Sequence, residues 1–152
     1  MRSLREALGG NALQNGVERI KRAAIAGGFE GAQEAGAQLL QVFESWGGEL
    51  TQHMFKEFVL PELTYIVNTV KKEIPQVPMT VFGRGLSHAL EALSKTKYDV
   101  VGLDWSIDPA DARRRCGDAC SFQGNLDPCA LYGTPETLRS EVKYMLSRFG
   151  ST

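Results

Sequence analysis

The sequence predicts an α/β fold in which four consecutive βα units form a parallel sheet. Four short apolar runs each end abruptly in small or polar residues, and a stretch with helical periodicity follows each run. The runs are Leu40–Ser45, Met79–Phe82, Val100–Trp105 and Phe122–Pro128. Four such units make half of an eight-stranded barrel, which takes about 250 residues when complete. A compact doubly wound sheet is the alternative, because the short connections allow either arrangement.

Length and composition describe one globular domain with few electrostatic preferences. The 152 residues are 43% hydrophobic, enough for a core, and the net charge of −1 predicts no strong electrostatic attraction to nucleic acid or anionic membranes. Apolar runs stay well below the roughly 18 residues of a membrane span. The three cysteines, in a chain without a secretory signal, indicate reduced thiols and a cytoplasmic location. The arginine-rich start is typical of a solvated helical face and only weakly resembles a transit segment; the latter makes a plastid the alternative compartment.

The expected elements follow in order along two segments. Residues 1–35 predict a helical N-terminal segment with helices at Ser3–Leu8 and Val17–Ala26, and residues 36–152 hold the partial barrel. The expected strands are Gln38–Phe43, Pro78–Phe82, Tyr98–Leu103, which is apolar enough for burial on both faces, and Ser121–Gly124. The expected helices are His53–Glu73, kinked or divided at Pro61, a helix capped by Ser87 that runs to Lys95, Pro109–Cys116 after the Asp108 cap, and Pro135–Phe149 after the Thr134 cap.

Polar residues at the strand ends are the candidate functional residues, because barrels and related folds carry their active sites at the carboxyl ends of strands. Ser45 follows the first strand, where a buried polar strand cap is the alternative. Asp104 follows the third strand and either accepts a hydrogen bond from a ligand or closes its loop toward Asp108. Turn chemistry alone would explain Asn125 and Asp127 after the fourth strand.

Other chemical motifs favour structural roles. Gly83–Gly85 starts like a phosphate loop but lacks the third glycine and the following Gly-Lys-Ser/Thr, although its Arg84 is a cation that can meet an acidic ligand. Cys116 and Cys120 have no partner pair at zinc spacing, so no metal site is expected. His53 and His88 are expected on helix faces, and the run Arg113–Arg115 on a solvated helix.

Three of these segments together resemble uroporphyrinogen decarboxylases. They are Leu40–Ser45, Gly102–Trp105 and Gln123–Tyr132, and their order and spacing fit the family as well. The similarity runs from about Gly36 to Gly150, and the Gln-Gly-Asn-Leu-Asp-Pro motif is specific within the family. Related corrinoid methyltransferases are disfavoured, because they carry a zinc-binding His-x-Cys where Phe82–Gly85 stand here.

The resemblance implies a (β/α)8 barrel and a carboxy-lyase activity. The family removes carboxylates from the four acetate arms of uroporphyrinogen III to give coproporphyrinogen III, on the route to haem and chlorophyll, without a cofactor or metal. Ser45 matches the family's substrate-contacting serine and Phe43 the aromatic residue beside it. Gln123, Gly124 and Asn125 match a strand end near the cleft.

Several family residues have no counterpart in these 152 residues. The resemblance places the arginine-rich segment, the pyrrole-binding aspartate and the pocket tyrosine before the matched part, and the final Asn-Leu-Gly-His-Gly strand after it. No catalytic residue is therefore assigned, and the chain alone is expected to be inactive. The alternative is a non-catalytic half barrel that forms a homodimer or pairs with a full-length paralogue, because bare strand edges invite pairing with another chain.

Overall fold

The computed structural model describes residue 28, residues 31 and 32, and residues 36–150. The chain divides into two compact units, one ending at Gln38 and the other beginning at Leu39. In the first unit, the backbone N–H of Ala37 donates to the carbonyl of Ala32 at 2.9 Å. The expected helices Ser3–Leu8 and Val17–Ala26 lie outside the described residues and stay predictions.

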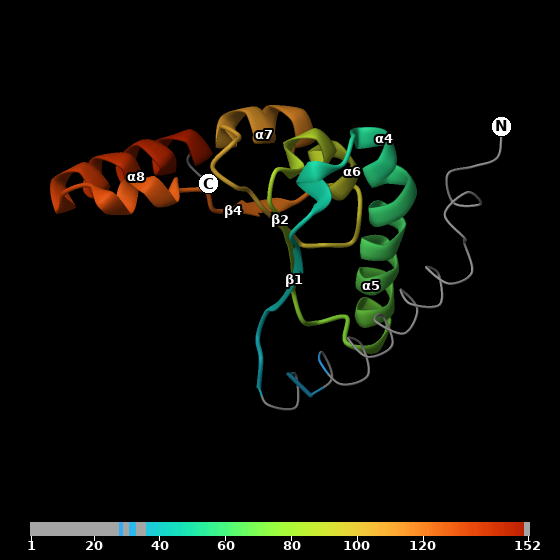
Figure 1. Ribbon diagram of the computed structural model, residues 1–152. Coiled ribbons are helices and arrows are strands. Elements are labelled where there is room, and N and C mark those ends of the chain that lie inside the picture. Colours follow the sequence, from blue (N-terminus) through green and yellow to red (C-terminus); the bar gives the residue numbers. More distant parts are fainter. Residues whose placement is uncertain (1–27, 29–30, 33–35, 151–152) are drawn as a thin grey trace. The chain divides into compact units, whose positions relative to one another are not determined.

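The second unit contains a four-stranded sheet in which all neighbouring strands are parallel (Figure 1). The strands are β1 (Leu40–Glu44), β2 (Met79–Gly83), β3 (Val100–Gly102) and β4 (Ser121–Gln123). Their spatial order is the order of the chain, β1-β2-β3-β4. A doubly wound sheet reverses its strand order at a switch point, whereas a barrel adds each strand beside the previous one. The fold is therefore a partial barrel, as the sequence predicted.

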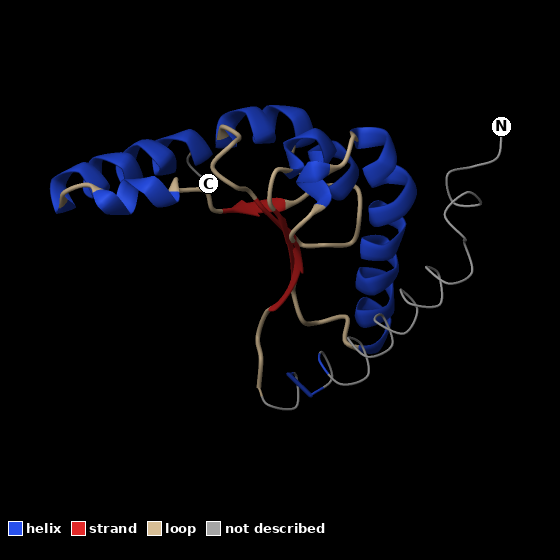
Figure 2. Ribbon diagram, viewed as in Figure 1, coloured by secondary structure: helices blue, strands red, loops and turns tan. Residues whose placement is uncertain are grey.

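Helices follow every strand and cover one side of the sheet. The longer elements are α4 (Gln52–Met54), the π-helix η3 (Phe55–Val59), α5 (Leu60–Glu73), α6 (Leu90–Leu93), α7 (Pro109–Cys116) and α8 (Pro135–Phe149), with 3₁₀ turns η2 (Gly47–Glu49), η4 (Leu86–Ala89) and η5 (Pro128–Tyr132). Figure 2 shows α5, α6 and α7 on one side of the curved sheet, while α8 extends away beyond β4. Within residues 39–150, no helix covers the opposite face.

Strand register separates the side chains into two sets. Val81 pairs with Val42 on one side and Val101 on the other, and all three point toward the helices. Val81 is completely buried and Val101 is 1% exposed. The other set, which includes Phe43 and Phe82, lies on the face without helices. We call these the covered face and the open face.

Two of the expected helix caps are confirmed. The Asp108 carboxylate accepts from the backbone N–H of Ala110 at 2.7 Å, and the Thr134 hydroxyl accepts from the N–H of Thr137 at 3.3 Å. The Ser87 cap is wrong. Gly85 has a φ of 70° and turns the chain two residues after β2 ends, so the 3₁₀ turn begins at Leu86 and includes Ser87. The following α6 ends at Leu93, close to the expected end at about Lys95.

Pro61 divides the first long helix, as expected. The π-helix η3 precedes it, and α5 begins at Leu60 with the proline in its first turn. Proline fits there because the first turn of a helix needs no backbone N–H.

The first and third strands differ from expectation in burial. β1 is an edge strand in which Leu40 alone is buried, so a buried first strand is wrong. In β3, Val101 is buried but Val100 is partly exposed, because the helices cover only one face.

Candidate functional site

The open face carries an aromatic pair near the carboxyl ends of β1 and β2. The rings of Phe43 and Phe82 meet edge to face, with centroids 6.1 Å apart and an interplanar angle of 68°. Phe43 is 70% exposed. A Cβ added at Gly102 on β3 would lie 2.8 Å from the Phe82 ring, so glycine leaves the room that this ring occupies. The result is an exposed apolar platform on the open face.

A second contact shows that the sheet curves toward this face. The Gln123 side-chain Nε2 donates to the side-chain Oε1 of Gln41 at 3.3 Å, although the two residues lie on opposite edge strands. Edge strands of a flat four-stranded sheet lie roughly 14 Å apart, and side chains perpendicular to it would not meet. Thr80, which pairs with Gln41 on the adjacent strand, is completely buried. The open face is therefore concave, like the inner wall of a barrel.

The turn after β1 places Ser45 at the carboxyl edge. The Glu44 carboxylate accepts from the backbone N–H groups of Trp46, at 3.1 Å, and Gly47, at 2.5 Å, and so fixes the turn on both sides of Ser45. A Cβ at Gly47 would lie 2.3 Å from the Glu44 carboxylate and 2.9 Å from the Phe55 ring. Ser45 itself is exposed, so it is not a buried strand cap.

Asp104 ties the loop after β2 to the loop after β3. Its carboxylate accepts from the N–H of Gly85 at 2.5 Å, and from the N–H and hydroxyl of Ser106 at 2.9 and 2.5 Å. Burial opposes ionisation, but these hydrogen bonds and the nearby charge of Arg84 lower the pKa of Asp104 below its usual value. The Asp104 carboxylate therefore holds these two loops by hydrogen bonds from Gly85 and Ser106, and not by a contact with Asp108. Because its carboxylate takes the Gly85 N–H, the Gly83–Gly85 segment is a turn and not a phosphate cradle.

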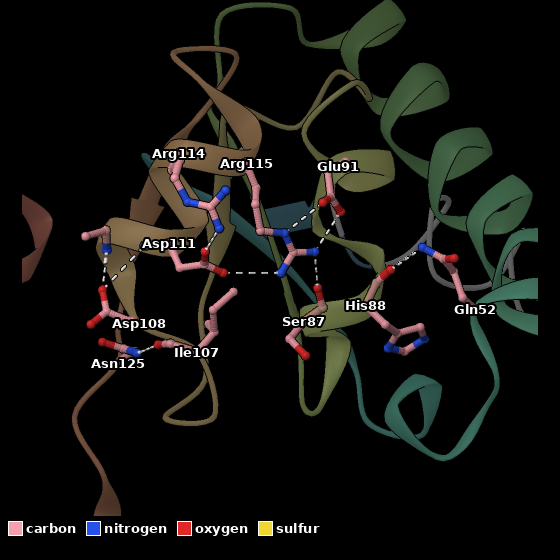
Figure 3. Close-up of polar contacts among 11 residues, drawn as sticks. Gln52, Ser87, His88, Glu91, Ile107, Asp108, Asp111, Arg114, Arg115 and Asn125 are labelled. Carbon is pink, nitrogen blue, oxygen red and sulfur yellow. Dashed lines mark hydrogen bonds and ion pairs between the residues drawn. The ribbon is translucent and has the colours of Figure 1, made fainter.

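Asn125 extends this network to the loop after β4. Its side-chain amide donates to the carbonyl of Ile107 at 2.6 Å (Figure 3). It also donates to the carbonyl of Asp104 at 2.9 Å. Gly124 has a φ of 120°, and a Cβ there would lie 2.3 Å from the Leu103 carbonyl oxygen. The Asp127 carboxylate accepts from the N–H of Cys129 at 2.8 Å and begins η5. Turn chemistry accounts for both Asn125 and Asp127, as the sequence allowed.

The arginine run of α7 makes more contacts than a solvated face would. Arg115 donates to both carboxylate oxygens of Glu91, at 2.7 and 2.8 Å, and to the Ser87 carbonyl at 2.6 Å (Figure 3). This fork lowers the pKa of Glu91 from 4.5 to about 2, against an opposing effect of burial. Arg113 lies over the Phe122 ring at 4.6 Å. Solvation is correct for Arg114, which is exposed, and wrong for Arg113 and Arg115.

The remaining thiols and imidazoles form no metal centre within the described residues. No group of three His, Cys, Asp or Glu side chains there could hold a metal ion. Cys116, Cys120 and Cys129 are free thiols, and burial raises the pKa of Cys120. His53 is exposed and lies 3.5 Å from the Glu57 carboxylate, whereas His88 Nδ1 lies 3.2 Å from the Gly85 carbonyl.

The sequence predicted Phe43 and Ser45 as substrate contacts, which stay predictions, and it did not single out two residues that share the open face with Phe43. Phe82 and Gln41 lie on the same face as Phe43, and the period-two alternation of β1 and β2 was the available signal.

No helix of residues 28, 31–32 and 36–150 has the length and apolar character needed to cross a bilayer.

Comparison with known proteins assigns these features to one family. The uroporphyrinogen decarboxylase (URO-D) family model matches residues 18–152. A uroporphyrinogen decarboxylase of Salinibacter ruber is 51% identical over 117 residues, which are 77% of this chain and 33% of that protein. Those of Dictyostelium discoideum and Danio rerio are 48% and 52% identical, each over 80% of this chain and 34% of their own length. The chain thus spans about a third of these relatives, and it belongs to the uroporphyrinogen decarboxylase family.

Proposed function

We propose that this chain functions in the decarboxylation of uroporphyrinogen III and forms one wall of the pocket that holds the tetrapyrrole. The relatives are uroporphyrinogen decarboxylases by name. The observation that carries the proposal is the aromatic pair of the exposed Phe43 and the half-buried Phe82, on a concave face at the carboxyl ends of parallel strands. Barrel enzymes place their active sites at that end.

Phe43 and Ser45 have separate roles in this proposal. The Phe43 ring packs against the apolar surface of the pyrrole rings, since aromatic side chains supply large contact areas. The Ser45 hydroxyl donates to a carboxylate arm of the substrate. Decarboxylation at a pyrrole needs no cofactor, because a protonated pyrrole carbon accepts the electron pair that carbon dioxide leaves behind. The protein must then exclude water and stabilise charge around the ring.

The described part of the chain supplies one side of such an enclosure. Its sheet has four strands, and the face that carries Phe43 is open to solvent. A tetrapyrrole bound to this face would contact protein on one side and water on the other. We therefore expect the 152-residue chain to bind uroporphyrinogen weakly and not to decarboxylate it.

Equilibrium dialysis under anaerobic, reducing conditions tests this proposal. Uroporphyrinogen III is equilibrated with the 152-residue chain and quantified by fluorescence after oxidation to the porphyrin, and chromatography reveals any loss of carboxylates. We expect Phe43→Ala to raise the Kd about five- to tenfold. Tyr132→Ala is the matched control, because Tyr132 is 92% exposed in η5 and lies outside the open face. Undetectable binding by the unaltered chain would overturn the proposed pocket, and turnover would overturn the expected inactivity.

A second candidate function is association without catalysis, as a homodimer or with a full-length paralogue. The specific observation is that the edge strand β1 and its flanks expose large apolar side chains. Leu39 is 47%, Phe43 70% and Trp46 75% exposed. Such an edge pairs readily with another chain. Sedimentation velocity at micromolar concentration, with and without a full-length relative, tests it; a folded monomer under both conditions would contradict it.

We propose the cytoplasm as the compartment, with a plastid as the alternative. The three free thiols support a reducing environment. Imaging of a fluorescent fusion in the source organism, with a plastid marker, would separate the two.

A further inference from the structure

Arg84 differs from the other arginines of the described residues. Each of the other five has a carboxylate partner within 4 Å: Asp118 for Arg113, Asp111 for Arg114, Glu91 for Arg115, Glu136 for Arg139 and Asp108 for Arg148. Within the part of the chain that the structure describes, Arg84 alone makes no such ion pair, and its side chain is exposed. A guanidinium presents five N–H donors in a rigid fork that suits carboxylates.

The backbone of Arg84 is held on two sides. Its N–H donates to the Glu44 carbonyl at 3.3 Å, directly before Ser45. A Cβ at Gly48 would lie 2.5 Å from the Arg84 carbonyl oxygen, so the loop after β1 packs closely against it. The next residue, Gly85, donates its N–H to the Asp104 carboxylate. The structure thus fixes where this side chain starts and leaves its end in solvent.

The position of Arg84 faces the candidate site. Arg84 directly follows β2, and the alternation of the strand places position 84 on the side of Thr80 and Phe82, the open face. The charge of Arg84 helps to lower the pKa of Asp104, but hydrogen bonds from Gly85 and Ser106 already occupy that buried carboxylate. A guanidinium that makes no ion pair among the described residues, on the same face as an aromatic pair, is an arrangement that attracts an anionic ligand with an apolar body.

We infer that Arg84 binds a carboxylate arm of the tetrapyrrole and so determines specificity for highly carboxylated substrates. The inference rests on the proposed function, because it uses the same open face. In this arrangement Phe43 and Phe82 contact the rings, Ser45 donates one hydrogen bond, and Arg84 supplies a paired, charge-assisted hydrogen bond to a carboxylate at the edge of the ring system.

Charge-matched variants of the 152-residue chain test the role of Arg84. Anaerobic equilibrium dialysis measures the Kd for uroporphyrinogen III of the unaltered chain, Arg84→Gln, Arg84→Lys and the control Arg139→Gln. Arg139 is an exposed arginine of α8 that pairs with Glu136, so its loss makes the same change in net charge. We expect Arg84→Gln to raise the Kd about tenfold, Arg84→Lys about two- to threefold, and Arg139→Gln to leave it unchanged. Binding by Arg84→Gln should also depend less on salt.

The outcomes separate the two proposals. If the unaltered chain binds and Arg84→Gln binds equally well, the role of Arg84 is overturned while the proposed pocket stands. If Arg84→Gln and Arg139→Gln weaken binding equally, net charge explains the effect and the role is likewise overturned. If the unaltered chain does not bind, the proposed pocket fails and the inference with it. Urea midpoints verify folding; should Arg84→Gln lower its midpoint, Arg84→Met, which keeps an aliphatic stem, replaces it in the comparison.

Discussion

The covered and open faces of this sheet are built on the same backbone but differ in what surrounds their side chains. On β3, Val101 points toward the helices and is 1% exposed, whereas the adjacent Val100 points the other way and is partly exposed. On β1 the open-face residue Phe43 is 70% exposed. The covered face holds aliphatic residues sealed by α5, α6 and α7, while the open face holds aromatic and amide side chains.

The two faces contribute to different properties of the protein, the covered face to folding stability and the open face to binding. Burial of apolar surface contributes roughly 25 cal/mol per Å², so the covered face contributes most of the folding free energy. The exposed groups of the open face gain nothing comparable from folding, and they remain available for a ligand or another chain. The covered and open faces meet at the carboxyl edge of the sheet, where Asp104 and Asn125 connect three loops. Changes on each part should therefore produce different effects.

The largest effect should come from the packing beneath the edge. Phe55 is completely buried, packs edge to face against His88 and lies beside Gly47. We expect Phe55→Ala to lower the free energy of unfolding by about 3–5 kcal/mol, because it leaves a cavity. Urea denaturation followed by circular dichroism measures this change. A loss below about 1 kcal/mol would show that neighbouring side chains move in and fill the cavity.

Asp104→Ala should be next. The substitution leaves the backbone N–H groups of Gly85 and Ser106 without their acceptor, at a cost of about 2–3 kcal/mol in the free energy of unfolding. Hydrogen exchange should reveal faster exchange at these two amides. If exchange at Gly85 stays unchanged, water replaces the carboxylate and the edge network is less important than the geometry indicates.

The adjacent valines of β3 offer the most direct comparison of the two faces. We expect Val101→Ala to lower the free energy of unfolding by about 2 kcal/mol, because it removes two buried methyl groups and leaves a cavity. Val100→Ala should cost less than half as much, since that side chain keeps contact with solvent. Equal losses in denaturation would mean that something covers the open face in solution, as the association hypothesis predicts.

The ion pair of Arg115 and Glu91 should have a smaller, pH-dependent effect. The pKa of Glu91 falls to about 2 in the folded chain, so the pair stabilises above the ordinary value of 4.5 and this contribution disappears as the pH falls toward 2. Glu91→Gln should cost about 1 kcal/mol at pH 7, because both side chains are partly exposed. Denaturation at several pH values should show this difference shrinking below pH 4.5; a constant difference would contradict the assignment.

The smallest change in stability should follow Phe43→Ser on the open face. We expect the free energy of unfolding to change by less than about 0.5 kcal/mol, because the ring is already mostly exposed. The same substitution should weaken binding of uroporphyrinogen in equilibrium dialysis. A large loss of stability would instead place Phe43 in the packed interior of an assembly.

Particular residues show which features of the structure the local sequence pattern can predict. Asp108 and Thr134 were predicted as caps, because an N-cap depends only on a side chain and the next few backbone N–H groups. Ser87 has the same local preference, yet Gly85 turns the chain first and Ser87 falls within η4. Phe43 and Ser45 are predicted substrate contacts that rest on the resemblance alone. The position of Phe82 beside Phe43 follows only from the register of β1 and β2, because the sequence of one strand does not determine which residues of another strand it pairs with.

The sequence by itself determined the succession of four βα units, the order of its elements and the family to which the chain belongs. These follow from periodicity, capping residues and motifs, which act over a few neighbouring residues. The tertiary structure decided that the strands lie in chain order and that Asp104 accepts hydrogen bonds from the loops after β2 and β3. It also decided that Arg115 pairs with Glu91, while Arg84 makes no ion pair among the described residues. Each of these depends on residues far apart in the chain, and folding alone brings them within hydrogen-bonding distance.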